Sequence, residues 1–320
     1  MRAIQYHEYG DPSVLRCEQR PKPRCLPGQV LIRVIAAGVN PVDSRLRSGE
    51  MRWVLPGGFP RTPGYDVAGI IEQCDPNGKF RPGDRAVAYL DNIYGGGYAE
   101  LAACAESVAV PLPTGLSWRE AAGLPLAGST ALQSLEKHGR LESGQRVLVI
   151  GASGGVGSFA VPIAKRLGAQ VTAVASGDYE GYVRELGADD FIDYRRTHYA
   201  DEDARYDLIF DAAGKSSYEE AKAALNDSGR YVTTEPSPKA ALDAVRTLFK
   251  SQRATPMLAR PKGEDLSRLV RWAAEGELRV NIASDFLLEQ AADAHRFLNE
   301  QSFCGKLVLR VDPDAESGGH

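Results

Sequence analysis

The sequence predicts an α/β protein in which a unit of alternating strands and helices is inserted into a β-rich domain. Three observations predict this class. A glycine-rich turn lies between an apolar run and a helical segment near the middle of the chain. Strand-like and helical segments alternate after that turn, which is typical of a parallel sheet with helices on both faces. The first third of the chain instead has short strand-like runs between Pro–Gly turns, which favours an antiparallel sheet or barrel.

The central turn follows the β-branched run 147–150, and the sequence from there to Gly157 is VLVIGASGGVG. Residues 158–168 then form a predicted helix that ends at a glycine. Strand, glycine turn and helix in this order predict a dinucleotide-binding unit of the Rossmann type.

Each glycine of this turn has an expected role. Gly154 and Gly155 allow the backbone to approach a pyrophosphate, and Gly157 allows the helix to pack closely on the strand. The helix N-terminus offers free N–H groups to the phosphates. The predicted cofactor-binding turn comprises Ala152, Ser153, Gly154, Gly155, Val156 and Gly157. Because Ala152 stands where the usual pattern has its first glycine, a tight turn that binds nothing remains the alternative.

The rest of the inserted unit follows the same alternation. Further strands are predicted at 170–176, 190–194, 206–211 (which leads to Gly214), 230–234 and 252–260, and a helix ends at 183–188. The last strand is an edge strand, and an exposed edge invites pairing with a second copy. A homodimer is therefore expected.

The β-rich domain is predicted from both ends of the chain. Strand-like runs are found at 30–36, 67–71, 85–88 and 306–311, and helical runs at 265–275 and 288–300. We therefore expect one domain from residues 1–124 and 261–320, and a dinucleotide-binding domain from residues 125–260.

Composition excludes several classes of function. The formal net charge of −4 gives no reason to expect nucleic acid or an anionic membrane as a partner. No apolar run is long enough to span a bilayer, and the N-terminus has no signal-peptide core, so a cytoplasmic protein is expected. The five cysteines are scattered without a C-x-x-C pair, which indicates free thiols. The five histidines are dispersed too and are expected at the surface.

With these motifs the sequence resembles the medium-chain dehydrogenase/reductase superfamily, in its zinc-free quinone oxidoreductase and enoyl reductase branch. The matching segments are PGQVLIRV (27–34), AGVNPVD (37–43), PGYDVAG (63–69), GDR (83–85), GGYAE (96–100), GASGGVG (151–157), LGAD (186–189) and GKLV (305–308). The resemblance implies a Rossmann domain inserted in a GroES-like β-barrel-type domain, with the substrate bound between them.

The resemblance also implies where a catalytic zinc ion would bind. The zinc-dependent members carry ligands at positions that match Asn40, Tyr65 and 126–128, and none of these offers a thiolate or imidazole here. No metal is therefore expected. Without a Lewis acid, hydride addition to an electrophilic carbon, as in a quinone or an α,β-unsaturated carbonyl, is easier than alcohol oxidation.

NADPH is the expected cofactor. The second strand of the unit ends without the acidic residue that binds the ribose 2′-hydroxyl in NAD-dependent folds. Ser176 leaves room for a 2′-phosphate, and Tyr194 and Arg195 could close over it. Asp178 and Glu180 place negative charge nearby, so NADH remains open, and Arg195 can equally be a solvated surface residue.

Three residues outside the glycine turn are matched by the family to positions near the nicotinamide. Asn40 is expected near the nicotinamide ribose, or else as a turn residue before a proline. Thr130 could orient the nicotinamide, or serve only as a helix hydroxyl. Lys306 could reach the cofactor cleft, or remain a strand-edge lysine.

The proton donor is less clearly marked. Relatives place a tyrosine eleven or five residues after the asparagine, and this chain has Met51 and Arg45 there. Tyr65 is the expected replacement, although a buried structural tyrosine is the alternative. Arg45 could bind a substrate carbonyl or acid, or form a surface salt bridge.

These observations predict an NADPH-dependent, zinc-independent reductase of a quinone or an α,β-unsaturated carbonyl. Two alternatives remain. One is an enoyl reductase acting on acyl thioesters, and the other is a non-enzymatic NADPH-binding protein with a sensing or structural role.

Overall fold

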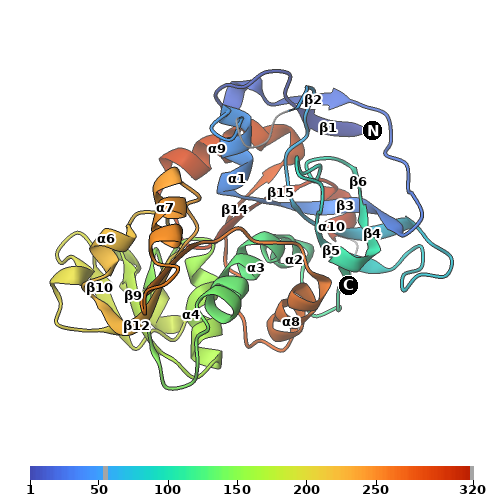
Figure 1. Cartoon of the computed structure of the whole chain (residues 1–320). Helices are drawn as coiled ribbons and strands as arrows, with labels where there is room; N and C mark the ends of the chain where they lie inside the picture. The colour runs from blue at the N-terminus through green and yellow to red at the C-terminus, as the bar shows by residue number, and fades with distance from the viewer. Residues whose placement is uncertain (53–56, 318–320) are drawn as a thin grey trace.

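The computed structural model describes residues 1–52 and 57–317, which form two domains that lie side by side (Figure 1). The middle of the chain forms one domain, and both ends of the chain meet in the other. The predicted insertion of a Rossmann-type unit into a β-rich domain is confirmed. The domain bounds at residues 124/125 and 260/261 stay predictions.

The middle domain contains a parallel sheet with the strand order β10-β9-β8-β11-β12-β13. Its strands are β8 (Arg146–Ile150), β9 (Gln170–Ala175), β10 (Asp190–Asp193), β11 (Tyr206–Asp211), β12 (Leu225–Thr233) and β13 (Arg253–Pro256). Chain order starts at the centre, runs to one edge and then builds the other half, as in dinucleotide-binding sheets. Every strand predicted for this sheet is confirmed, with β13 shorter than the predicted 252–260.

Helices cover this sheet. They are α3 (Pro125–Gln133), α4 (Gly157–Arg166), α5 (Glu180–Glu185), α6 (Tyr218–Ala221) and α7 (Pro238–Arg246), with a π-helical segment η3 (Ser134–His138) and the short 3-10 helices η4 (Gly177–Tyr179) and η5 (Tyr199–Asp201). The predicted helix after the glycine turn is α4, and it is followed by Gly168 in the left-handed region with φ of 82°. A residue without a Cβ adopts this conformation without strain, which explains the predicted stop.

The second sheet has the strand order β14-β15-β3-β4-β5-β7, and β6 also pairs with β3. Its strands are β3 (Gln29–Val39), β4 (Asp66–Cys74), β5 (Arg85–Tyr89), β6 (Leu101–Ala105), β7 (Ala109–Pro111), β14 (Ile282–Leu287) and β15 (Lys306–Arg310). β15 and β3 are antiparallel, with Leu307 opposite Val39. This register brings Lys306, from the end of the chain, next to Asn40, from its beginning.

The remaining elements surround this sheet. They are the hairpin strands β1 (Arg2–Gln5) and β2 (Arg16–Gln19), the helices α1 (Pro41–Ser48), α2 (Trp118–Gly123), α8 (Gly263–Ala274), α9 (Ala291–Glu300) and α10 (Pro313–Ser317), and the short 3-10 helices η1 (Pro12–Val14), η2 (Glu106–Val108) and η6 (Leu288–Gln290). The predicted helices 265–275 and 288–300 are α8 and η6 with α9. One apolar cluster includes Val87 of the second sheet and Val147 and Phe159 of the Rossmann-type domain. The two domains therefore share a packed core.

Candidate active site

The glycine turn joins β8 to α4, and its glycines have different steric roles. A Cβ atom at Gly157 would lie 2.1 Å from the carbonyl oxygen of Gly151, so a larger residue would push the helix away from the strand. A Cβ atom at Gly154 would meet only that same carbonyl oxygen, at 3.4 Å. Space therefore remains beside Gly154 for a ligand.

The same turn contacts the start of β15. Gly305 donates its N–H to the carbonyl of Ser153 at 3.0 Å, and a Cβ at Gly155 would lie 3.1 Å from Cδ of Lys306. Within the described residues, the N–H groups of Gly155 and Val156 have no backbone partner. These donors at the start of α4 suit the oxygens of a pyrophosphate.

Lys306, Asn40 and Asp66 form a buried cluster next to the turn, each at most 3% exposed. Nζ of Lys306 donates to Oδ1 of Asn40 and, at 3.0 Å, to the carbonyl of Val39. Nδ2 of Asn40 donates to Asp66 at 2.8 Å, and the N–H of Leu126 donates to the other carboxylate oxygen at 2.8 Å. Burial lowers the pKa of Lys306, but the charges of Asp66 and Lys306 favour each other's ionised form.

Asp43 fixes the loop that carries Asn40. Its carboxylate accepts the N–H of Asn40 at 2.9 Å, the N–H of Gly64 at 2.9 Å and the hydroxyl of Tyr98 at 3.2 Å. Burial raises the pKa of Asp43 to about 7, against the effect of these donors. The loop before α1 is thus tied to the segment before β4.

His295 extends this network, and the expectation that it lies at the surface is wrong. The side chain is 0% exposed, and burial together with Arg47 lowers its pKa to about 3, so the imidazole is neutral. Arg47 donates to Nδ1 at 3.3 Å. Because a guanidinium can only donate, the proton of His295 must be on Nε2, which lies 3.4 Å from the hydroxyl of Tyr98.

The two hydroxyls expected to act in catalysis both have partners within the protein. Thr130 donates to the carbonyl of Leu126 in α3 at 2.7 Å, as a helix hydroxyl does. Tyr65 donates to the carbonyl of Ile93 at 2.5 Å, and burial raises the pKa of Tyr65. A catalytic role for either residue stays a prediction.

The residues expected at the ribose 2′-position lie together at the ends of β9 and β10. Ser176 is buried and donates to Asp178 at 2.9 Å. Arg195 contacts the same carboxylate at 2.9 Å and Asp193 at 3.3 Å, while Tyr194 is 62% exposed. Arg195 is therefore ion-paired rather than freely solvated.

At the carboxyl ends of β11 and β12, Gly214 adjoins Glu235. A Cβ at Gly214 would lie 3.1 Å from Cβ of Glu235. The carboxylate of Glu235 accepts a hydrogen bond from Nη2 of Arg45 at 2.5 Å. Arg45 belongs to α1, so this ion pair crosses from the β-rich domain to the Rossmann-type domain.

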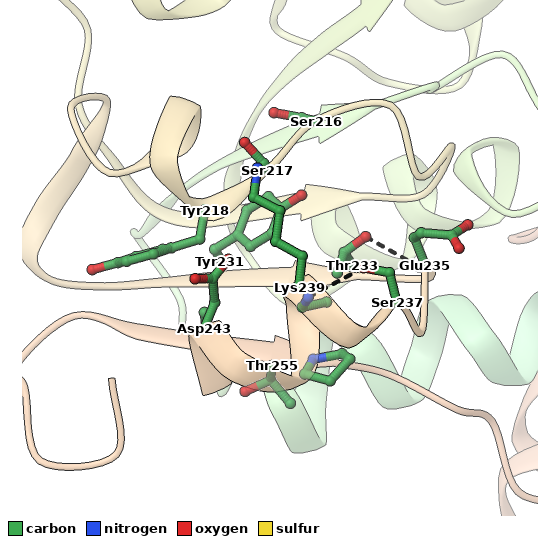
Figure 2. A pocket seen from close by; sticks show the side chains of 13 residues that line it. Ser216, Ser217, Tyr218, Tyr231, Thr233, Glu235, Ser237, Lys239, Asp243 and Thr255 are labelled. Atoms are coloured by element: carbon green, nitrogen blue, oxygen red, sulfur yellow. Dashed lines mark hydrogen bonds between the residues drawn. The ribbon is translucent and has the colours of Figure 1, made fainter. Parts of the chain in front are cut away.

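A small cavity of about 50 Å³ lies beside β12, β13 and α7 (Figure 2). Its lining is rich in hydroxyl groups and includes Ser216, Ser217, Tyr218, Tyr231, Thr233, Ser237 and Thr255. Glu235 also lines it, and Figure 2 shows its carboxylate directed away from these hydroxyls. The volume suits water rather than a quinone or a nucleotide.

Comparison with known proteins agrees with this geometry. Residues 26–114 match the alcohol dehydrogenase GroES-like domain, and residues 186–309 match the zinc-binding dehydrogenase family. A chloroplastic quinone-oxidoreductase QR1 of Triphysaria versicolor is 35% identical, over 97% of this chain and 98% of that protein. The chain belongs to the medium-chain dehydrogenase/reductase superfamily, in its quinone oxidoreductase branch.

Two further members of this superfamily are similar along nearly the whole chain. The NADPH-dependent alkenal/one oxidoreductase of Arabidopsis thaliana is 31% identical, over 98% of this chain and 80% of its own length. The solved structure of the quinone oxidoreductase from Coxiella burnetii superposes with a TM-score of 0.90 and 30% identity, covering 97% of this chain and 99% of that one.

The positions of the family's catalytic zinc ligands do not suit a metal in this member. Asn40 is bonded to Lys306 and Asp66, Tyr65 to Ile93, and the third position contributes the N–H of Leu126. An ammonium group already lies among them, and zinc prefers thiolate and imidazole ligands. Residues 1–52 and 57–317 hold no cluster of three or more His, Cys, Asp or Glu side chains that suits a metal ion. The metal-free expectation stays a prediction.

Sequence reasoning missed Glu235 and the full role of Asp66. Glu235 follows the predicted strand 230–234, and carboxyl ends of parallel strands meet at the ligand-binding edge of such sheets, which was a usable signal. Asp66 lies inside the PGYDVAG motif, but its pairing with a lysine 240 residues away follows from sheet register and not from local pattern.

Proposed function

We propose that this chain is an NADPH-dependent, zinc-independent reductase that transfers a hydride to a quinone or an α,β-unsaturated carbonyl. The observation that carries the proposal is the contact of Lys306 with both Gly155 and Asn40. It joins the glycine turn, where we expect the phosphates to bind, to a buried polar cluster of Lys306, Asn40 and Asp66. The relatives named quinone oxidoreductase and alkenal/one oxidoreductase support the substrate class.

The residues present fit a dinucleotide. Ala152 to Gly157 would hold the pyrophosphate, because Gly154 leaves open space and the amides of Gly155 and Val156 lack partners. Asn40, Thr130, Lys306 and Gly214 would surround the nicotinamide end. Ser176, Tyr194 and Arg195 would hold the 2′-phosphate, a preference supported by the NADPH-dependent relative. Bound NADPH supplies the hydride.

The chain's own groups would orient the reactants. Asn40 is held by Lys306 on its oxygen and Asp66 on its nitrogen, so its position is fixed before the ligands arrive. The hydroxyl of Tyr65 already donates a hydrogen bond to the carbonyl of Ile93, and burial raises the pKa of Tyr65. A hydroquinone anion is a weak base that can take its proton from water, so quinone reduction needs no side-chain acid. This favours a quinone over an acyl thioester.

The test follows absorbance at about 340 nm, which reports the reduced nicotinamide. NADPH would be supplied with each of four acceptors in turn: 9,10-phenanthrenequinone, 1,4-benzoquinone, a simple enone and an enoyl thioester. The series would then be repeated with NADH in place of NADPH, and with protein that has been treated with a chelator. Turnover with NADPH that survives chelation is expected. Loss of turnover on chelation would contradict the zinc-independent mechanism.

The same assay separates the alternatives. Turnover of the thioester alone would favour the enoyl reductase. Tight NADPH binding without turnover of any acceptor would favour a sensing or structural role.

We also propose a cytoplasmic location. Within the described residues, no helix has the length and apolar character needed to cross a membrane.

We propose that the chain forms a homodimer, but not by pairing of the edge strand β13 with a second copy. The outward N–H of Ala254 in β13 is already bonded to Oγ1 of Thr247 at 2.9 Å, and Pro256 has no N–H. Pairing through this edge would therefore form few hydrogen bonds. The support lies in four exposed apolar side chains in and after α7, namely Leu242, Val245, Leu248 and Phe249.

A further inference from the structure

The ion pair between Arg45 and Glu235 joins the two domains beside the expected nicotinamide site. Arg45 is five residues after Asn40, and Glu235 adjoins Gly214. A cofactor that starts at the glycine turn of β8 extends toward the carboxyl ends of β11 and β12. The pair thus lies where an acceptor would approach the nicotinamide.

Both partners are held by their surroundings. The N–H of Glu235 donates to Oγ1 of Thr233 at 3.1 Å, and its stem lies against Gly214. Arg45 projects from α1, and a second carboxylate, Glu50, is 3.9 Å from its Nε. The side chains of Arg45 and Glu235 are 36% and 35% exposed, so a molecule from solvent can reach them.

We propose that Arg45 and Glu235 determine the charge of the acceptors that this enzyme accepts, an inference that rests on the proposed reduction of quinones or enones. Each charge neutralises the other at the approach to the nicotinamide. The intact pair therefore favours uncharged acceptors. Removal of Glu235 leaves Arg45 with only the more distant Glu50, and removal of Arg45 leaves Glu235 as a negative charge. Each change should shift the preference in a direction set by the sign of the charge that remains.

The expected signs are opposite for the two partners. In Glu235→Gln, Arg45 loses its nearest counter-charge and can bind a carboxylate on the acceptor. In Arg45→Gln, Glu235 is left as an unpaired negative charge and repels the same carboxylate. Loss of domain contact alone would instead affect charged and uncharged acceptors equally. The ratio of the KM values for a charged and an uncharged acceptor therefore distinguishes a change in specificity from a loss of domain contact.

The test compares two acceptors that differ in charge and otherwise by a single methyl group, a menadione with a propanoic acid side chain and the methyl ester of the same compound. KM would be measured for both with the wild-type chain, each single variant and the double variant Arg45→Gln/Glu235→Gln. The matched control is Glu185→Gln, which removes a more exposed ion pair with Arg279, 3.3 Å long. This ion pair joins α5 to the segment after α8, away from Arg45 and Glu235, so its removal should leave the cleft unchanged.

We expect Glu235→Gln to lower the acid-to-ester KM ratio by about three- to tenfold, and Arg45→Gln to raise it by a similar factor, because the pair is half-exposed. The double variant should return close to the wild-type ratio, and Glu185→Gln should not change it. An unchanged ratio in both single variants, or a shift of both in one direction, would overturn the proposal.

A second readout separates this proposal from the proposed function. Dissociation constants of the acid and the ester, measured by quenching of tryptophan fluorescence with NADP⁺ present, should show the same opposite shifts. If no acceptor is turned over, the proposed function fails, and the ratio of dissociation constants alone decides the role of the pair. If neither compound binds, the proposal fails as well.

Discussion

Asn40 lies between an ammonium and a carboxylate, and an amide is the side chain that suits both. Its oxygen accepts from Lys306 and its nitrogen donates to Asp66. A carboxylate at this position would face Asp66 with a like charge, and an apolar residue would remove one hydrogen bond from each charge, leaving Lys306 with the carbonyl of Val39 and Asp66 with the N–H of Leu126. The residue expected near the ribose thus also bridges two buried groups of opposite charge.

This bridge leads to a prediction for Lys306→Met. The substitution leaves Asp66 buried without a positive charge, and breaking a buried pair lowers the free energy of unfolding by about 3–5 kcal/mol. Adding Asp66→Asn removes the uncompensated charge, so the double variant should lose less than the single one. Urea unfolding of the three proteins measures both values. A double variant that is less stable than Lys306→Met would contradict the prediction.

Asp43 predicts a pH dependence of stability. Its native pKa is raised to about 7 from 3.8, so the folded state retains a proton that the unfolded state has already released. Between these values stability falls as pH rises, by up to about 4 kcal/mol, and it is constant above the native pKa. Asp43→Asn does not titrate.

Urea unfolding of both proteins at several pH values measures this effect. The stability of wild type relative to Asp43→Asn should fall from pH 5 to 7 and then level. A relative stability that rises over this range would mean that the donors from Asn40, Gly64 and Tyr98 outweigh burial.

At the scale of the element, the turn between β8 and α4 combines two steric requirements. Gly157→Ala places a Cβ 2.1 Å from a backbone oxygen and should weaken the fold. Gly154→Ala meets only an ordinary contact at 3.4 Å, but its methyl group would occupy the space that we propose for the pyrophosphate.

We therefore expect Gly154→Ala to keep the wild-type melting temperature and to bind NADPH about tenfold or more weakly. Calorimetric titration and thermal unfolding measure the two effects. The matched control is Gly181→Ala in α5, where a Cβ meets nothing within 4 Å. Equal affinity in Gly154→Ala and the control would show that the phosphate lies elsewhere.

Prediction from sequence was accurate where the pattern is local and incomplete where partners are distant. The strands of the parallel sheet are short apolar runs bounded by turns, so each could be located. The strands β1, β2, β6, β7 and β14 were not predicted, because partly exposed or very short strands lack a continuous apolar run. His295 has no local signal of burial, since Arg47 and Tyr98 reach it from distant segments.

At the scale of the whole molecule, the exposed apolar side chains in α7 and in the turn that follows it predict how two copies associate. Phe249 is 94% exposed and Val245 is 69% exposed. Burying such side chains in an interface stabilises association by about 1.5–3 kcal/mol each. Phe249→Ser with Val245→Ser should therefore shift the dimer toward monomer, and sedimentation or light scattering measures the change.

The matched control for this prediction is Leu258→Ser, which is 68% exposed but lies outside α7 and the turn that follows it. A control that dissociates as readily as the double variant would place the interface elsewhere. A wild-type chain that is monomeric at micromolar concentration would contradict the dimer itself.

The pairing of β15 with β3 has a consequence for the order in which this protein is made. Asn40 is translated well before Lys306, which lies 266 residues further along the chain. Until β15 arrives, Asp66 has no ammonium nearby and the glycine turn lacks its contact with Gly305. Fragments that end before β15 therefore have the glycine turn but lack the contacts of Gly305 and Lys306 at the cleft, and we expect such fragments not to consume reduced cofactor.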